Sequence, residues 1–230
     1  MKFIIFDTET TSLPKFRGLP ESSCLDKFND RFVKGRPMIF RGEPIQVGGL
    51  VCDEELNILD IISFYCMPSE PISEEAFKVN GISNELIYRL AGGKTLEHYL
   101  GDVYEDLFYN SNNVYIGHNV TFDMKCVNNT LLDYCNPPVK FGDKTTRLYG
   151  LDDSKSYYYD TMSSARSLLH LPKNPKLIDL VHSLRPDLDL DHLAKVLLSK
   201  YHKSASVKFH DAVFDSICTW VVAYELRKLG

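Results

Sequence analysis

Two acidic side chains stand two residues apart near the amino terminus, directly after an apolar run. Asp7 and Glu9 flank Thr8 and follow residues 3–6, which read Phe-Ile-Ile-Phe. Residues two apart on a strand point to the same face, so an extended backbone brings both carboxylates together. Carboxylates held that close are stabilised by a shared proton or a cation, and their hard oxygen atoms favour Mg²⁺ or Mn²⁺. If the strand ends at Asp7, both acids are instead solvated.

A second polar segment follows another apolar run in the middle of the chain. Residues 117–123 read Gly-His-Asn-Val-Thr-Phe-Asp and come after residues 114–116, which read Val-Tyr-Ile. This pattern places Asp123 at the start of a helix that follows a strand, where the sites of α/β proteins usually lie. We therefore expect Asp123 to join the acids of the first segment.

These two segments resemble the first two motifs of the DnaQ-like, or DEDDh, 3'→5' exonucleases, a family that includes a proofreading subunit of DNA polymerase III. Further segments resemble the family in the same order: residues 44–48, 75–82, 159–161, 165–166, 190–194 and 210–215. The resemblance covers nearly the whole chain except two long loops. The sequence departs from the family pattern at Ser12, where Gly is usual, at Asn80, where His is usual, and in the length of residues 14–43.

The third motif of the family is a His-x-x-x-x-Asp pair. That spacing occurs three times in this chain, in His118 with Asp123, His182 with Asp187, and His210 with Asp215. Spacing alone does not choose among the three, but the family pair lies at the start of the last helix, where only His210 and Asp215 stand. The tyrosine branch of the family would need Tyr-x-x-x-Asp, which Tyr149 and Asp153 satisfy from a loop before that helix. We expect His118 to pack or hydrogen-bond locally, and the other histidines to be surface or core residues.

The resemblance implies an active site with two metal ions. Asp7, Glu9 and Asp215 would hold one Mg²⁺ or Mn²⁺, and Asp7, with water and phosphate oxygens, would hold the second. Asp123 would complete the acidic shell through water. His210 would take a proton from the water molecule that attacks the phosphodiester, and the product would be a nucleoside 5'-monophosphate.

The resemblance also implies a binding site for the 3' end of a single strand of nucleic acid. Its substrate-side positions are Thr10, Leu13, Asn119 and Phe122, although Leu13 and Phe122 could equally pack in the core. We expect DNA as the substrate, and a polymerase or replication protein is a candidate partner. An exoribonuclease or oligoribonuclease-like enzyme, or a catalytically inert nucleic-acid-binding domain of the same fold, remains an alternative.

The composition is that of an ordinary globular domain. The chain has 230 residues, 44% of them hydrophobic and 25% charged, enough to bury one substantial core. Its net charge of -5 does not suit a protein that coats nucleic acid non-specifically. Residues 14–43 nevertheless hold seven basic and four acidic side chains, which makes a basic stretch of net charge +3 behind the first motif. We expect one exonuclease domain over residues 1–230, with insertions at about 14–43 and 136–158.

The cysteines and the amino terminus indicate the compartment in which the protein is expected. The six cysteines form no C-x-x-C pair, which argues against a zinc site and a disulfide framework and predicts free, mostly buried thiols. The apolar run at the amino terminus is too short for a signal peptide or a membrane span. We therefore expect a cytoplasmic or other intracellular protein without a membrane partner.

Periodicity and capping residues predict alternating strands and helices. Strands are expected at residues 2–7, 44–52, 58–67, 114–117 and 157–159, with residues 8–13 as the exit from the first. Helices are expected after Ser73 and Ser83, and over residues 95–110, 122–132, 161–169, 177–183, 190–201 and 212–229. This order predicts an α/β fold, an RNase H-like mixed β-sheet flanked by helices.

Overall fold

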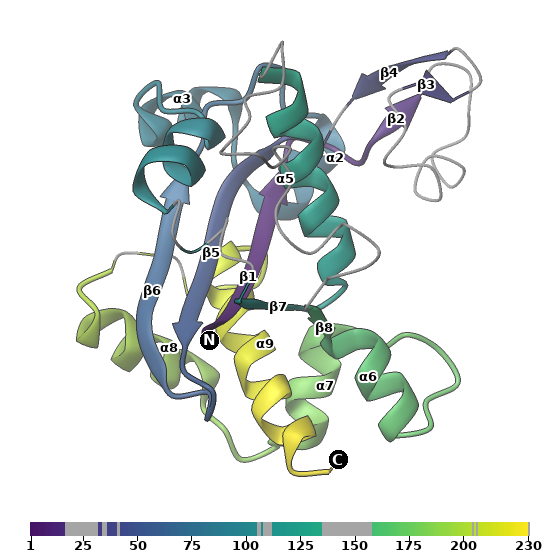
Figure 1. Ribbon diagram of the computed structural model, residues 1–230, viewed down its shortest axis with the longest axis vertical. Coiled ribbons are helices and arrows are strands. Elements are labelled where there is room, and N and C mark those ends of the chain that lie inside the picture. Colours follow the sequence, from purple (N-terminus) through teal and green to yellow (C-terminus); the bar gives the residue numbers. More distant parts are fainter. Residues whose placement is uncertain are drawn as a thin grey trace.

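A mixed β-sheet with helices on both faces forms the centre of the molecule (Figure 1). The computed structural model describes residues 1–16, 32–33, 36–40, 42–104, 107, 112–134, 158–203, 205 and 207–229. The sheet contains β1 (Phe3–Thr10), β5 (Pro44–Cys52), β6 (Ile58–Tyr65), β7 (Val114–Gly117) and β8 (Tyr158–Asp160). The α/β class expected from the sequence is therefore confirmed.

Strand β1 lies in the middle of the sheet, whose order is β6-β5-β1-β7-β8. β1 pairs antiparallel with β5 on one edge, and β5 pairs antiparallel with β6. On its other edge β1 pairs in parallel with β7, which pairs in parallel with β8. The β1–β7 register covers only Phe3 to Ile5 of β1, so among the described strands the carboxyl-terminal half of β1 has a partner on one edge only.

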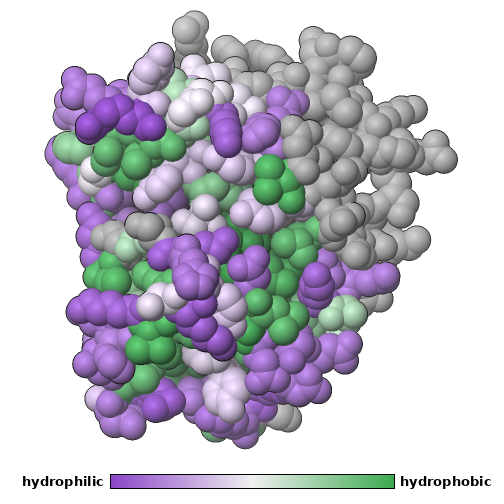
Figure 2. All heavy atoms as spheres, turned by 90° about the vertical axis from the view of Figure 1, so that its left-hand side faces the viewer, coloured by the Kyte–Doolittle hydropathy of each residue, from purple (hydrophilic) through white to green (hydrophobic). Residues whose placement is uncertain are grey.

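Helices cover the two faces of this sheet. Their bounds are α2 Glu74–Asn80, α3 Asn84–Ala91, α5 Val120–Tyr134, α6 Thr161–Leu168, α7 Leu177–Leu184, α8 Leu190–Lys200 and α9 Ala212–Arg227. The alternation of β1 divides the core, because Ile5 packs with residues of α7, α8 and α9, whereas Ile4 and Phe6 pack with residues of α5. None of the described helices combines the length and apolarity needed to cross a bilayer. On the face that carries the β6 edge, apolar side chains form separate patches between polar ones (Figure 2).

The first strand is longer than the sequence indicated. It was expected to end at Asp7, with Thr8 as the start of its exit, yet it continues to Thr10. The reason is its pairing with β5, which runs from Phe3↔Cys52 to Thr10↔Pro44 and holds the acidic triplet extended. The alternative of solvated acids at a strand end is thereby excluded for Glu9, which is only 7% exposed.

Part of the expected insertion at residues 14–43 is a small sheet of its own. The strands β2 (Lys15–Phe16), β4 (Arg36–Phe40) and β3 (Phe32–Val33) pair in that order, apart from the main sheet (Figure 1). Apolar residues of β-forming type in Phe32–Val33 and Arg36–Phe40 explain why this stretch is not wholly a loop. The second expected insertion, 136–158, lies outside the described residues except for Tyr158.

The helix expected over residues 95–110 also differs from the element that the structure has there. In the described part of this range the main element is a π-helix, η1, at His98–Val103, and the Tyr104 N–H donates to the Tyr99 carbonyl at 2.8 Å. Phe64 of β6 stacks on both tyrosines, with ring centroids 4.2 Å and 5.4 Å away. The i→i+5 bond from Tyr104 to Tyr99 therefore joins the two residues that stack on Phe64.

Helix α9 packs directly on β5 where the strand has a glycine. A Cβ atom at Gly48 would lie 2.1 Å from the Val213 nitrogen and 2.2 Å from the Ala212 carbonyl carbon. The Ser216 hydroxyl donates to the Gly48 carbonyl at 2.9 Å and fixes the helix along the strand. The close approach of two backbones thus depends on Gly48.

We predict that Gly48→Ala lowers both stability and activity. The methyl group would collide with backbone atoms that cannot rotate away, at a cost of about 1–3 kcal/mol, and would push the start of α9 off the sheet. Gly92→Ala is the control, because nothing lies within 4 Å of its Cβ position and only its φ of +56° is unfavourable. Thermal melts and a nuclease assay should show that Gly92→Ala keeps full activity and Gly48→Ala does not. Full activity in both variants would contradict this account of α9.

Candidate active site

Two carboxylates of the site come from the carboxyl-terminal half of β1. Asp7 is half-buried and Glu9 is buried, and both are on the face of β1 that Ile5 shares, against which α9 packs. Their alternation with Phe6 and Thr8 follows from the extended backbone, which β5 continues to pair through this region. The expected placement of both acids on one face is thus what the strand geometry produces.

The third carboxylate, Asp215, is placed by the start of α9. The N-cap residue Asp211 accepts from the N–H groups of Val213 and Phe214 at 3.1 Å and 3.4 Å. Gln46 of β5 joins this end to the sheet, because its Nε2 donates to Asp211 at 3.2 Å and its Oε1 accepts from the Ala212 N–H at 3.2 Å. Asp215, one turn later, is 8% exposed. Gln46 and Gly48 therefore fix the position of Asp215 relative to β1.

The fourth carboxylate, Asp123, reaches β1 from the first turn of α5. Its Oδ1 accepts from the Thr8 backbone N–H at 3.0 Å and from the Thr8 hydroxyl at 2.7 Å. This N–H lies on the edge of β1 that β7 leaves unpaired after Ile5. A backbone donor on such an edge needs a partner, and Asp123 supplies it while standing close to Asp7.

The four acids perturb one another because they share a buried region. Burial, and then the charges of Asp123, Asp215 and Glu9, raise the pKa of Asp7 well above its usual range. Burial, followed by the charges of Asp215 and Asp123, raises the pKa of Glu9 to about 8. Burial is also the main cause that raises the pKa values of Asp123 and Asp215 to about 7. Such a group of like charges is stabilised by protons or by a cation.

His210 completes the cluster immediately before α9. It is exposed, its backbone has a φ of +63°, and its N–H donates to Asp215 Oδ2 at 3.1 Å. One ring nitrogen of His210 and one carboxylate oxygen each of Glu9 and Asp215 lie within 4.8 Å of one another, a spacing that fits a metal ion. Within the described part of the chain, the buried Asp215 Oδ1 has no hydrogen-bond partner. An unpartnered buried carboxylate oxygen beside other acids fits a hard divalent cation such as Mg²⁺ or Mn²⁺.

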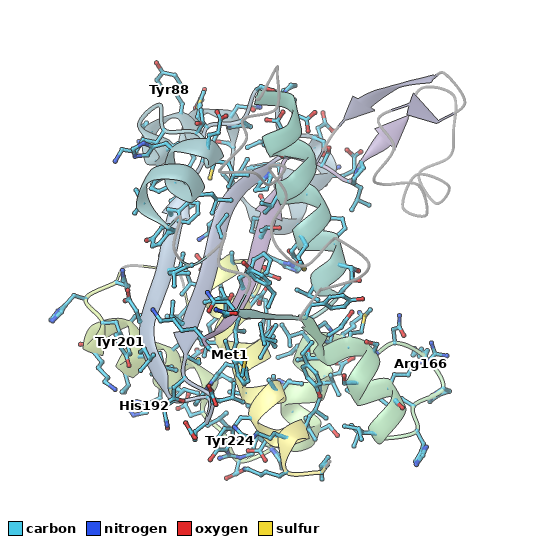
Figure 3. All side chains as sticks on the ribbon, viewed as in Figure 1. Met1, Tyr88, Arg166, His192, Tyr201 and Tyr224 are labelled. Atoms are coloured by element: carbon cyan, nitrogen blue, oxygen red, sulfur yellow. The ribbon has the colours of Figure 1, made fainter. Side chains whose placement is uncertain are left out.

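The remaining histidines do not belong to this cluster. The ring nitrogens of His118 lie 3.1 Å from the Thr161 hydroxyl and 3.0 Å from the Pro175 carbonyl oxygen, so its local bonding is confirmed. His182 is exposed on α7, and the aspartate five residues later, Asp187, pairs with Arg185 at 3.4 Å. His192 projects from α8, away from the carboxyl end of β1 (Figure 3).

The expected substrate-side residues differ in exposure and in hydrogen bonding. Leu13 is 50% exposed, so it is not a core residue, and Phe122 is half-buried. Asn119 is exposed with a φ of +70°, but its N–H donates to Asp160 at 3.1 Å and its carbonyl accepts from the Phe122 N–H. Its backbone N–H is therefore occupied, whereas its exposed side chain can reach a ligand. The Thr10 hydroxyl donates to the Ser12 carbonyl at 3.0 Å.

Comparison with known proteins identifies the family of this site. A family model described as "Exonuclease" matches residues 4–219, which include all four carboxylates and His210. The chain belongs to this exonuclease family. The expected resemblance to DnaQ-like exonucleases and the expected enzyme class, an exonuclease, are therefore confirmed.

Individual relatives are distant. The chain is 24% identical over 225 residues to a DNA polymerase III of PolC type from Pediococcus pentosaceus, and the match covers 93% of this chain but only 12% of that protein. A solved structure of exonuclease X with 5' overhanging duplex DNA is 16% identical, has a TM-score of 0.56, and is matched over 98% of this chain and 91% of its own. E. coli exonuclease I with a dT13 oligonucleotide is 18% identical with a TM-score of 0.56, over 97% of this chain and 40% of its own. At this identity the two structures confirm the RNase H-like fold.

Three residues near the acids of this exonuclease were not assigned a role from the sequence. Thr8 holds Asp123, Gln46 holds the start of α9, and the Asn80 side chain donates to the Thr10 carbonyl, next to Glu9 in the chain, at 3.4 Å. Gln46 had a visible signal, because it is a polar residue inside an otherwise apolar strand. Asn80 stood out only as a departure from the family pattern. The four described cysteines (Cys52, Cys66, Cys126 and Cys218) are buried and free as expected, and Cys24 and Cys135 lie outside the described residues.

We predict that the acidic cluster destabilises the metal-free protein as the pH rises. Glu9 has a folded-state pKa of about 8 against an ordinary 4.5, so the folded chain keeps a proton that the unfolded chain releases. The contribution of Glu9 to stability is therefore fully present below pH 4.5 and is lost as the pH rises to about 8. Melting temperatures in EDTA should fall less steeply over this window for Glu9→Gln than for wild type. Glu75→Gln, an exposed acid on α2, should follow wild type. Parallel curves for wild type and Glu9→Gln would contradict the raised pKa.

Proposed function

We propose that this exonuclease removes nucleoside 5'-monophosphates from the 3' end of single-stranded DNA with the help of two Mg²⁺ or Mn²⁺ ions. The observation that carries the proposal is the buried, unpartnered Asp215 Oδ1 beside Glu9 and His210. Family membership supplies the reaction class, and the structure supplies a group of carboxylates suited to hard cations.

The proposed ligands follow from the arrangement of the carboxylates. Asp7, Glu9 and Asp215 would hold one ion, and Asp7 would also hold a second, with Asp123 acting through water. Two divalent ions about 4 Å apart would stabilise charge on the attacking and leaving oxygens of an in-line displacement. The raised pKa values of the acids mean that loading the site releases protons at neutral pH.

His210 is the proposed general base. It is exposed beside Glu9 and Asp215, and its backbone bond to Asp215 holds it at the mouth of the acidic cluster. Its ring would accept a proton from water as the water oxygen bonds to phosphorus. The bond from phosphorus to the 3' oxygen of the preceding nucleotide then breaks, and that oxygen takes a proton from solvent. Leu13 and Asn119 would contact the terminal nucleotide, and Phe122 would stack on its base.

DNA is favoured over RNA by the proteins of similar fold. The solved relatives named above hold a DNA overhang or a dT13 oligonucleotide. The likeness to a PolC-type DNA polymerase supports a replication protein as partner, although this chain spans about 12% of that polymerase. A nucleic-acid-binding domain without catalysis is disfavoured because all five proposed catalytic positions carry the required residue types.

We predict that a 5'-labelled DNA strand shortens progressively from its 3' end only when Mg²⁺ or Mn²⁺ is present. EDTA should stop the reaction, because the carboxylates alone do not stabilise the charge that develops on the phosphate. A matched RNA strand, assayed in parallel, should shorten more slowly. Shortening that starts at the 5' end, or cuts within a circular strand, would refute the proposed polarity, and faster RNA degradation would refute the substrate.

We predict that His210→Ala lowers kcat by roughly 10²- to 10⁴-fold, the usual contribution of a positioned general base. Binding of a DNA strand should stay close to wild type, because no carboxylate ligand is lost. His182→Ala is the matched control, since this histidine also stands five residues before an aspartate but lies exposed on α7. If His182→Ala reduces kcat as strongly as His210→Ala, the third motif is wrongly placed.

A further inference from the structure

Lys208 is an exposed lysine two residues before His210. Its neighbours Val207 and Phe209 are half-buried and pack against the core that includes α9. The Phe209 ring also meets the Phe214 ring edge-on, with 5.0 Å between the centroids. Lys208 is therefore presented to solvent by a segment that is anchored on both sides of it.

The ammonium group of Lys208 lies at the end of α2. A Cβ atom at Gly81, which follows this helix with a φ of +74°, would be 3.6 Å from the Lys208 Nζ. The residue before Gly81, Asn80, is buried, and its Nδ2 donates to the carbonyl of Thr10 at 3.4 Å. Thr10 is the last residue of β1. The ammonium group is thus held beside the carboxyl end of β1, where the acidic cluster lies.

The charge of Lys208 has no partner among the described residues. It forms neither an ion pair nor a hydrogen bond with any of them. A cation near a helix carboxyl end can bond the last carbonyl groups, but here the Gly81 N–H caps α2 by donating to the Phe77 carbonyl at 2.8 Å. The three N–H donors of the ammonium group are therefore available to an anion from outside the described chain.

A cation at this place would offset the repulsion between the site and its substrate. A DNA strand carries a negative charge on every linkage, and here it must approach four carboxylates in a chain of net charge -5. The proposed metal ions act on the linkage that is cleaved, so the linkages beyond it need a different cation. Lysine binds phosphate as a point charge, and such a contact positions a strand without reading its sequence.

We propose that Lys208 binds a phosphate of the DNA strand that is not itself cleaved, in one of the linkages next to the terminal one. This inference rests on the proposed function, because it requires the 3' end of a strand to lie at the acidic cluster. The contact is the same before and during the reaction, so Lys208 contributes to KM and leaves kcat nearly unchanged.

Release of a labelled 3'-terminal nucleotide in Mg²⁺ measures this contribution. Lys208→Met removes the charge and keeps most of the apolar stem. It is expected to raise KM about 3- to 10-fold, and to reduce the slope of log KM against log salt concentration by about 0.7, the value for one phosphate contact in a single strand. Lys208→Arg should restore both. Lys195→Met is the matched control, because it removes an exposed lysine from α8, whose His192 projects away from the carboxyl end of β1 (Figure 3).

Strands with one neutral methylphosphonate linkage separate phosphate binding from a role in folding. The terminal linkage stays native, and the methylphosphonate replaces the second, third or fourth linkage from the 3' end. At one of these positions it should raise the KM of wild type as Lys208→Met does, and have little further effect on Lys208→Met.

Two results would overturn the phosphate contact and leave the proposed function standing. One is additive losses of Lys208→Met and the methylphosphonate at all three linkages, as expected if Lys208 only stabilises the end of α2. The other is an equal KM for Lys208→Met and Lys195→Met. No release of the terminal nucleotide by wild type would overturn the proposed function, and this inference with it.

Discussion

Mutual repulsion among four carboxylates, three of them buried and one half-buried, is the constraint that the rest of this structure has to satisfy. Asp7, Glu9, Asp123 and Asp215 come from one strand and two helices, and burial raises the pKa of each. Hydrophobic packing must supply the free energy that keeps them together. The strand β1, with buried residues on both faces, and the almost wholly buried helix α9 are the elements that supply it.

Two contacts of the protein backbone determine where the acids lie relative to one another. The absence of a side chain at Gly48 lets α9 approach β5, and the early end of β7 leaves the Thr8 N–H for Asp123. Neither contact includes an acid–base pair that would neutralise the cluster. The scaffold therefore fixes where the charges lie and leaves their compensation to protons or a cation, which is the condition for a site that binds metal reversibly.

The sequence predicted which acids lie close together better than it predicted the bounds of the elements that hold them. Asp7 and Glu9 could be expected on one face because strand alternation depends on local geometry alone. The role of His210, which was chosen by the place of the family's third motif, stays a prediction. The predicted end of β1 was wrong because the strand continues to Thr10 through its pairing with β5, which the local sequence does not reveal. The π-helix brings two tyrosines onto Phe64 of a distant strand. Thr8, Gln46 and Asn80 bond to partners 115, 166 and 70 residues away in the chain, so local patterns do not identify those partners.

We propose that the acidic cluster at the end of β1 binds divalent cations. Crystals soaked in Mn²⁺ and a nucleoside 5'-monophosphate, with diffraction data collected for anomalous scattering by manganese, test it directly. Anomalous density is expected within about 2.0–2.3 Å of carboxylate oxygens of Asp7, Glu9 and Asp215. Clear anomalous density elsewhere on the protein, with none among these three side chains, would contradict it.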